Sequence, residues 1–456
     1  MILKNTPLIA ILMSVFYFVM SVPVLVGQPV DVWAMGLIFL LVSICGVYMV
    51  AVNHKLEEHL ISTFAFAFYF VYMTMAQLYL LNKDSISLEE YKEAEGICIL
   101  SFLLMMIAVR FMRRIKTKRF QFLDQEPRIF SYYVLLLLAV AVHLLEIYSA
   151  GGIVAYFSAS YQAKFSSVAA EKMLGGIGKL VAPFAYYNLL YVTEKPRSTI
   201  HWVARIYFVF HLAMSYASGA SLAILYQLVA FCCMKIFASD DVENRKEKIR
   251  ITRKQRKWIF RGILFGGLGV LIAILVRFNR DAEGFSFAVL KDTYDLLITT
   301  STFDSLYYLS RTLRELTPQY SLGQFLFPFI FWVPRSIFPW KPVELGRIVA
   351  IAFKNFDSSV NGGYAVTPMA EFYYDMGYVG MIAGSFFLGC LLSLIQKKLN
   401  HSKNGRYKMV ITMMFMFPTI SLATSWSSLG SNYVGVVLFL CVASFLNQCK
   451  SGAGTR

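Results

Sequence analysis

The chain has 456 residues, of which 57% are apolar and 15% are charged, and its mean hydropathy is +0.58. This balance lies outside that of soluble globular domains and predicts an integral membrane protein. The formal net charge of +16 could indicate nucleic-acid binding, but the basic residues stand in short loops between apolar stretches, not along one face. The seven cysteines show neither metal-site spacing nor a pattern of disulfide pairing. We expect no nucleic acid, no metal and no other cofactor.

Apolar stretches that could cross a bilayer follow one another through the chain, since a hydrocarbon core of roughly 30 Å needs about 20 helical residues. They lie at 8–26, 32–52, 60–81, 96–109, 130–149, 180–193, 202–218, 221–238, 259–276, 378–395, 409–424 and 433–445. The first has no small-residue cleavage site, so we expect it to be retained as a helix. The sequence thus predicts an all-α, polytopic membrane protein with about twelve transmembrane helices.

These spans divide the chain into three regions. Residues 1–276 form an N-terminal membrane bundle of about nine helices, residues 277–377 form a long loop, and residues 378–456 contain about three C-terminal membrane helices. The loop is much longer than a connection requires, and such loops are usually functional. Its segment 325–340 is aromatic and interrupted by Pro328, Pro334 and Pro339. That composition suits a segment that lies in the membrane interface or re-enters the bilayer.

Lysine and arginine residues orient the predicted helices, because cytoplasmic loops carry the excess of both. The basic segments 110–128, 235–257 and 397–408 all fall on one side of the twelve-span arrangement. Both termini are then expected in the cytoplasm, and the long loop outside. The acidic segment 82–95 and the low-charge turn 426–432 are expected on the outer side as well. Orientation alone explains the cytoplasmic basic loops, to which we assign no catalytic role.

The long loop carries basic residues on the face where this rule disfavours them. They are Arg277, Arg280, Arg311, Arg314, Arg335, Lys341, Arg347 and Lys354. Arginine binds phosphate oxygens through two parallel hydrogen bonds and stays charged. The cluster therefore predicts an anionic ligand, of which a membrane-held diphosphate is the simplest. For any single arginine, snorkelling or pairing with an acid such as Asp281, Asp304 or Glu315 is an alternative.

Four short motifs lie in and just after this loop. They are Val333-Pro334-Arg335, Pro339-Trp340-Lys341-Pro342, Thr367-Pro368 and Glu371-Phe372-Tyr373, followed by Gly377 and Gly380. In order and spacing they resemble the signature of the O-antigen polymerase (Wzy) family, and the many-helix topology with a large external loop is similar over the whole chain. One departure is the turn 218–221, which carries no charge where several family members have an arginine. Arg277 or Arg280 could supply the missing cation.

The resemblance implies a glycosyltransferase that polymerises oligosaccharide repeat units carried on undecaprenyl diphosphate, at the outer face of the bacterial cytoplasmic (inner) membrane. The product would be a surface polysaccharide, such as lipopolysaccharide O-antigen, capsule or exopolysaccharide. A chain-length regulator (co-polymerase) and a flippase are then the expected partners, beside the lipid bilayer itself.

Two tasks follow for such a reaction. The leaving diphosphate needs fixed cations, and the acceptor hydroxyl needs a base within hydrogen-bond reach. The candidates for the diphosphate site are Arg277, Arg280, Arg335, Lys341 and Arg347. Glu371 is the leading candidate for the base, and Asp375 and Asp281 follow it. A salt bridge from Glu371 to an arginine, which would only hold the loop, explains the residue equally well.

Other classes of protein remain open. A ligase that transfers finished polymer to the lipid A core would share the topology and the diphosphate chemistry, although the motif from Thr367 to Glu371 favours the polymerase. A lipid-linked oligosaccharide flippase or other transporter should show an internal repeat and charges near the midplane, and the sequence shows neither. A non-catalytic scaffold would have no use for the cationic loop. His143 and His211 fall within predicted spans, where hydrogen bonding across helices explains them more simply than catalysis.

Overall fold

In the computed structural model, the described residues are 2–51, 60–83, 86–117, 128–158, 179–193, 199–217, 221–237, 303–333, 335, 337–354, 363–401 and 405–448, and their regular elements are all helices. In chain order these are α1 (Ile2–Leu25), α2 (Val30–Ala51), α3 (Leu60–Leu81), α4 (Leu88–Arg114), α5 (Ile129–Ser149), α6 (Ile153–Ser158), α9 (Val181–Val192), α10 (Thr199–Ala217), α11 (Ser221–Phe237), α14 (Ser305–Glu315), α15 (Gly323–Ile330), α16 (Leu345–Lys354), α17 (Pro368–Asn400), α18 (Gly405–Met416), the 3-10 helix η7 (Phe417–Ala423) and α19 (Trp426–Gln448). The predicted all-α fold is confirmed.

Six of the described helices are long and apolar enough to cross a membrane. They contain the stretches Val30–Met49, Leu60–Leu81, Leu88–Arg114, Ile129–Ser149, Pro368–Asn400 and Trp426–Gln448. Shorter apolar helices lie at Ala10–Leu25 and Ala223–Lys235. The predicted span 180–193 is helical as α9, but this helix has only 12 residues. The predicted span 259–276 lies outside the described residues. These helices are consistent with a multi-pass membrane protein.

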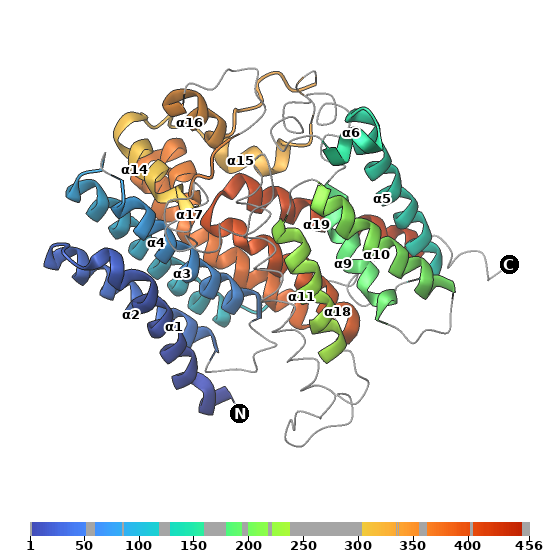
Figure 1. The fold of residues 1–456 in the computed structure, drawn as a ribbon, viewed down its shortest axis with the longest axis horizontal. Coiled ribbons are helices and arrows are strands. Elements are labelled where there is room, and N and C mark those ends of the chain that lie inside the picture. Colours follow the sequence, from blue (N-terminus) through green and yellow to red (C-terminus); the bar gives the residue numbers. More distant parts are fainter. Residues whose placement is uncertain are drawn as a thin grey trace.

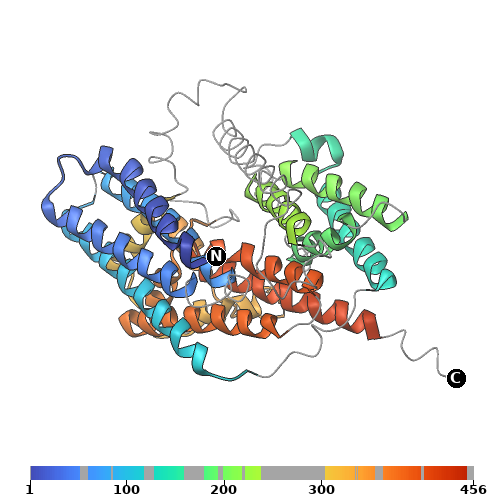
Figure 2. The same cartoon turned by 90° about the horizontal axis from the view of Figure 1, so that it is seen from below.

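The helices form two groups that the C-terminal helices join. Helices α1 to α4 pack side by side, and α9 packs with α5, α10 and α11 in the second group. Helix α17 lies along α4. Helix α18 contacts both α9 and α3, and α19 contacts both α9 and η7, which packs against α3. Figure 1 shows the C-terminal helices between the two groups, and in Figure 2 the orange and red C-terminal helices run from below the first group toward the second. The C-terminal helices therefore join the two groups, and α17 carries motif residues at its start.

Polar side chains connect the packed helices inside this bundle. Ser385 of α17 donates a hydrogen bond to Ser101 of α4, with 3.0 Å between the two hydroxyl oxygens. Gln396 of α17 accepts from the backbone N–H of Ile61 at the start of α3, at 2.8 Å. Such bonds between small polar residues are typical of helices that pack in a membrane. They fix the position of α17 along its neighbours.

Three segments that the sequence analysis placed in loops are helical. The acidic segment 82–95 is mostly the first two turns of α4, which begins with a capping box between Ser87 and Glu90. The predicted turn 426–432 is the start of α19, and α17 begins at Pro368 instead of near 378. A hydropathy window detects only the apolar part of a helix. It does not detect the polar first turns of a helix, where acidic residues and serines are favourable.

The described basic residues of the three predicted cytoplasmic segments meet at one end of the bundle. Their basic side chains donate to carbonyls in the last turns of other helices: Arg113 to Met49 of α2, Lys397 to Met112 and Ile115 at the end of α4, and both Lys235 and Arg406 to the end of α9. These contacts bring Arg113, Lys235, Lys397 and Arg406 to the same end, and the side of the membrane on which the three segments lie stays a prediction. Helices α14, α15 and α16 lie at the other end with the start of α17 (Figure 1). We call these the basic end and the motif end.

Candidate functional site

The motif residues gather at the motif end, around the first half of α17. Thr367 is the N-cap of this helix, and its hydroxyl accepts from the backbone N–H of Ala370 at 3.2 Å. Pro368 follows at the first helical position, where its fixed φ suits a helix and no N–H is needed. The Thr-Pro pair of the motif is therefore a helix start, and it places Glu371 in the first turn of α17.

The motif glycine Gly377 lies in a kink that divides α17, and the second motif glycine, Gly380, follows it. Met376 and Gly377 leave helical geometry, and Gly377 has φ 64° and ψ −153°, a region that is essentially accessible to glycine alone. At Gly380 an added Cβ would come within 2.3 Å of the carbonyl oxygen of Phe372, so a side chain has no room there. The kink separates the motif half of α17 from its apolar half, at the predicted boundary near residue 377.

The Glu371 carboxylate is fully buried and binds the N-terminus of α19 from the neighbouring helix α17, beside the N-cap residue Ser425. It accepts hydrogen bonds from the hydroxyls of Ser425 (3.1 Å) and Ser427 (2.6 Å) and from the backbone N–H groups of Trp426 and Ser427. The first N–H groups of a helix need such acceptors, and the positive end of the helix dipole favours a carboxylate. Glu371 thus holds a structural element, as one interpretation required, but the partner is a helix N-terminus and not an arginine.

Asp375 lies one helical turn beyond Glu371 and has the same task for α15. Its two carboxylate oxygens accept from the backbone N–H groups of Gln324 (2.9 Å) and Phe325 (2.8 Å). The segment before α15 is also bound to α17, because Gln319 and Ser321 donate their N–H groups to the carbonyls of Tyr374 and Asp375. Both acidic residues of the motif are therefore engaged by helix starts, and a base role for either would require it to exchange these partners.

A third helix start belongs to the same assembly. The buried Gln324 side chain accepts from the N–H of Leu345, the first residue of α16, and donates to the carbonyl of Val343, at 2.9 and 2.8 Å. Behind α16, Tyr364 packs against Tyr308 of α14 with ring centroids 4.9 Å apart, and burial raises the pKa of both hydroxyls. The starts of α15, α16 and α19 thus converge on one cluster, which we call the cap cluster: Glu371, Asp375 and Gln324.

Two of the predicted cations, Arg335 and Lys341, lie in the loop between α15 and α16. The exposed Arg335 guanidinium donates to the carbonyls of Lys341 (2.7 Å) and Pro342 (3.1 Å). The Lys341 ammonium donates to the carbonyls of Phe331 and Val333. Hydrogen bonds from these two cations to backbone carbonyls therefore hold the conformation of the loop. Arg347 lies in the first turn of α16, next to this loop in the chain.

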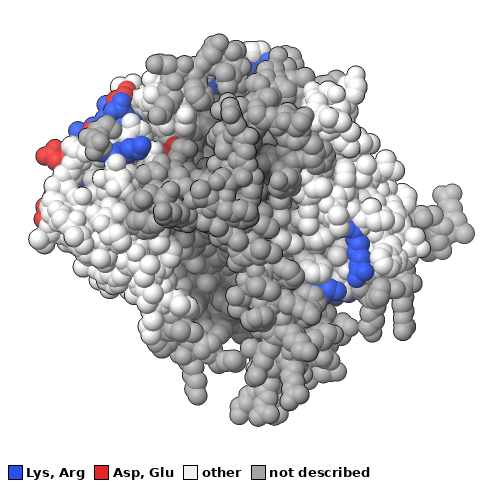
Figure 3. Space-filling view, viewed as in Figure 1, with Lys and Arg blue, Asp and Glu red and all other residues white. Residues whose placement is uncertain are grey.

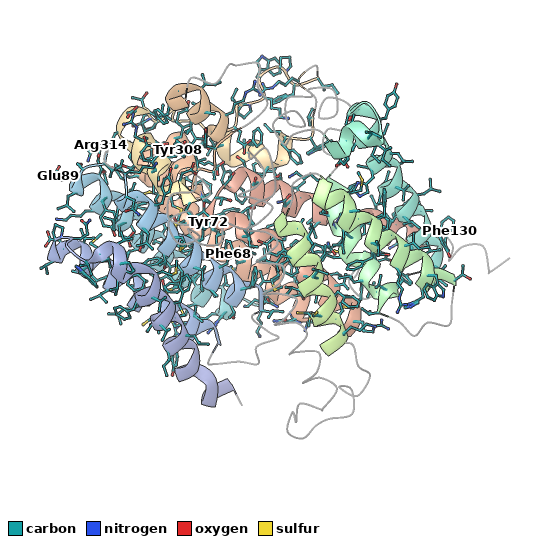
Figure 4. All side chains as sticks on the ribbon, viewed as in Figure 1. Phe68, Tyr72, Glu89, Phe130, Tyr308 and Arg314 are labelled. Carbon is teal, nitrogen blue, oxygen red and sulfur yellow. The ribbon has the colours of Figure 1, made fainter. Side chains whose placement is uncertain are left out.

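The other predicted cations have different surroundings. Arg311 pairs with Glu315 at 2.6 Å, as the pairing alternative proposed, and Arg314 pairs with Glu93 of α4 at 3.3 Å. Charged side chains gather over α14 and the start of α4 in the space-filling view (Figure 3), where Figure 4 labels Arg314 and Glu89 at one edge of the molecule. Arg277, Arg280, Asp281 and Pro334 lie outside the described residues.

The structure thus brings together part of the predicted site. Glu371, Asp375, Thr367 and Pro368 share the motif half of α17, and Arg335, Lys341 and Pro342 share one loop that α15 connects to it. Sequence reasoning missed Gln324, Ser425 and Ser427. A serine pair before an apolar run is a helix-start signal, so Ser425 and Ser427 could have been found. Nothing in the sequence distinguishes Gln324.

The two intramembrane histidines contact each other across helices, as the simpler interpretation predicted. His143 Nε2 of α5 lies 3.3 Å from His211 Nδ1 of α10, and His143 Nδ1 lies 3.0 Å from Glu146. Among the described residues, no group of three or more His, Cys, Asp or Glu side chains is arranged to hold a metal ion.

No protein family, curated protein or solved structure matches the chain in comparisons of its sequence and fold.

Proposed function

We propose that this protein polymerises oligosaccharide repeat units carried on undecaprenyl diphosphate, as a metal-independent glycosyltransferase of the Wzy type. The observation that supports this most is the convergence of the motif. Segments that resemble the family signature and lie up to about fifty residues apart in the chain build one assembly at the motif end, with cations in its loop and carboxylates beneath it. A chain that only had to sit in lipid would not need this arrangement.

The proposed reaction breaks a glycosyl phosphate bond and forms a glycosidic bond. The bond between the anomeric carbon of the growing chain and its diphosphate breaks, and a bond forms between this carbon and a terminal hydroxyl of the next lipid-linked unit. Undecaprenyl diphosphate leaves with the bonding electron pair, and the hydroxyl proton passes to a base. Arg335, Lys341 and Arg347 are the described cations proposed to stabilise the leaving group, because fixed cations beside a dehydrated surface act without reorganisation.

The proposal includes the full predicted topology. It has about twelve transmembrane helices in the bacterial inner membrane, cytoplasmic termini, and the motif end on the outer face, where a flippase would deliver the substrate and a chain-length regulator could contact the polymerase. Arg113, Lys235, Lys397 and Arg406 lie together at the opposite end, and this supports the orientation, since cytoplasmic ends carry the excess of Lys and Arg.

The role of Glu371 separates two versions of this proposal. If Glu371 is the base, Glu371→Gln should abolish polymer at normal protein level, and Ser427→Ala should leave polymer formation largely intact. If Glu371 acts only as the cap of α19, Ser427→Ala should reduce polymer as well, and adding it to Glu371→Gln should change little. Normal polymer with Glu371→Gln contradicts the base version.

The function itself is tested by deleting the gene in its host and separating the surface polysaccharide on a gel. Complementation would use wild type, Arg335→Ala and, as a matched control, Arg205→Ala, which removes an exposed arginine that lies over the Trp202 ring on α10. We expect the long ladder to collapse to a single repeat unit on its acceptor, and to return with wild type and Arg205→Ala but not with Arg335→Ala.

Two other outcomes would contradict the proposal. Full-length polymer that accumulates on its lipid carrier would indicate the ligase. An unchanged ladder would exclude this polymer as the product.

A further inference from the structure

The surface of the motif end carries large apolar side chains that the fold does not cover. On α15, Leu326 and Phe329 point outward, and in the loop that follows Trp332, Ile337 and Trp340 are exposed, the last two at 71% and 81%. We call these five residues the anchor surface. Exposure of these apolar side chains to water is unfavourable, so a patch of this kind marks a surface that contacts a membrane or another protein.

The opposite face of α15 is fully occupied by the protein. Pro328 is buried against Gly430 of α19, and Phe325 stacks on the Trp426 ring with centroids 5.9 Å apart. The eight residues of α15 span only about 12 Å, against roughly 30 Å for the hydrocarbon core. Helix α15 can therefore neither cross the bilayer nor turn its outward face to the protein.

The chemistry of the anchor surface fits the boundary between lipid headgroups and acyl chains. Tryptophan is enriched at this level, and the same loop carries the exposed Arg335, whose charge complements lipid phosphates. A second element at this end has the same character, because Tyr148, at the end of α5, and Ile153 of α6 are also exposed. Figure 1 shows α6 and α15 at the same end of the molecule.

We propose that the anchor surface lies flat in the membrane interface, where it binds phospholipid and holds the Arg335 loop at the depth of the lipid phosphates. The contact does not depend on any reaction, so it can hold or fail independently of the proposed polymerase activity. It differs from the re-entrant alternative for segment 325–340, which would carry the middle of the segment, where Trp332 lies, deep into the acyl chains.

Tryptophan fluorescence of the full-length protein tests this placement. The purified protein would be reconstituted in phosphatidylcholine–phosphatidylglycerol vesicles as wild type, Trp340→Phe and Trp426→Phe, and each difference spectrum isolates one indole. Trp426 is the matched control, since its side chain is 1% exposed and enclosed by protein. The quenchers are phospholipids brominated near the carbonyl end of the chain, phospholipids brominated near the methyl end, and aqueous iodide.

We expect the Trp340 emission to be quenched most by the shallow bromines, less by the deep ones, and weakly by iodide, while the Trp426 emission changes little with any of them. Strong iodide quenching without a bromine effect would overturn the proposal, because Trp340 would then face water or await a protein partner. Stronger quenching by the deep bromines would also overturn it, because Trp340 would then lie among the acyl chains and not at the level of the lipid phosphates.

Discussion

The two ends of the bundle use opposite charges to complete their helices. At the basic end, Arg113, Lys397 and Arg406 donate to the last carbonyls of α2, α4 and α9. At the motif end, Glu371 and Asp375 accept from the first N–H groups of α19 and α15. Each choice complements the partial charge of the helix end that it meets.

The difference between the two ends shows which charged side chains are not already explained by a contact with a helix end and could bind a ligand. The last carbonyls of the helices explain the cations at the basic end, and the first N–H groups of the helices explain both carboxylates at the motif end. Arg335 differs from all of these, because it is exposed and its two partners are carbonyls of an irregular loop. The comparison therefore directs the search for substrate contacts to this loop instead of to the acidic residues.

The largest effect is expected when the cap of α19 is removed. Glu371→Ala leaves two buried backbone N–H groups and two serine hydroxyls without their acceptor, which should lower the free energy of unfolding by about 4 kcal/mol. Thermal unfolding of the detergent-solubilised protein measures the loss. Glu89→Ala, which removes an exposed glutamate from the first turn of α4, is the control and should change little. Equal stability of the two variants would contradict the capping role of Glu371.

A somewhat smaller effect is expected at the kink. Gly377→Ala forces an alanine into a backbone region that only glycine occupies readily, which should cost about 2 kcal/mol. Gly405→Ala is a matched control, because Gly405 has no atom within 4 Å of an added Cβ and has an ordinary φ. If both substitutions had the same effect in thermal unfolding, the strain at Gly377 would not determine the direction of α17.

The sequence was sufficient for the positions of the apolar helices. The predicted span 60–81 coincides with α3, and the predicted break in 202–238 separates α10 from α11. These features depend on hydropathy alone, which local composition reports directly. The side of the membrane on which the basic segments lie follows from the alternation of successive spans, and it stays a prediction.

The partners of the motif residues were not predictable in the same way. Glu371 meets residues more than fifty positions away in the chain, and Asp375 meets the start of a helix that precedes it by about as much. The sequence around a carboxylate in a polar motif looks the same whether the carboxylate binds an arginine, a substrate hydroxyl or the first N–H groups of a helix. Only the packing of α15 and α19 against α17 decides among them.

Asp375 should be less sensitive to substitution than Glu371. In Asp375→Asn the remaining side-chain oxygen can still accept from one of the two N–H groups at the start of α15, so one bond is lost, at a cost of about 1.5 kcal/mol. Asp31→Asn, which alters an exposed ion pair with Lys92, serves as the control with an effect near zero in the same unfolding assay. A larger loss for Asp31→Asn would reverse the order that burial predicts.

The smallest effect is expected at the basic end, although Lys397 has as many carbonyl partners as Asp375 has N–H partners. Lys397 is only half-buried where it binds the carbonyls of Met112 and Ile115 at the end of α4, and water can replace a half-buried donor at a helix C-terminus. Lys397→Met should therefore cost only about 0.5 kcal/mol, against about 1.5 for the buried Asp375. Lys116→Met, which removes an exposed lysine close by, is its control. A loss for Lys397→Met as large as that for Glu371→Ala would mean that the two ends are equally buried, and the difference between them would then lie in charge alone.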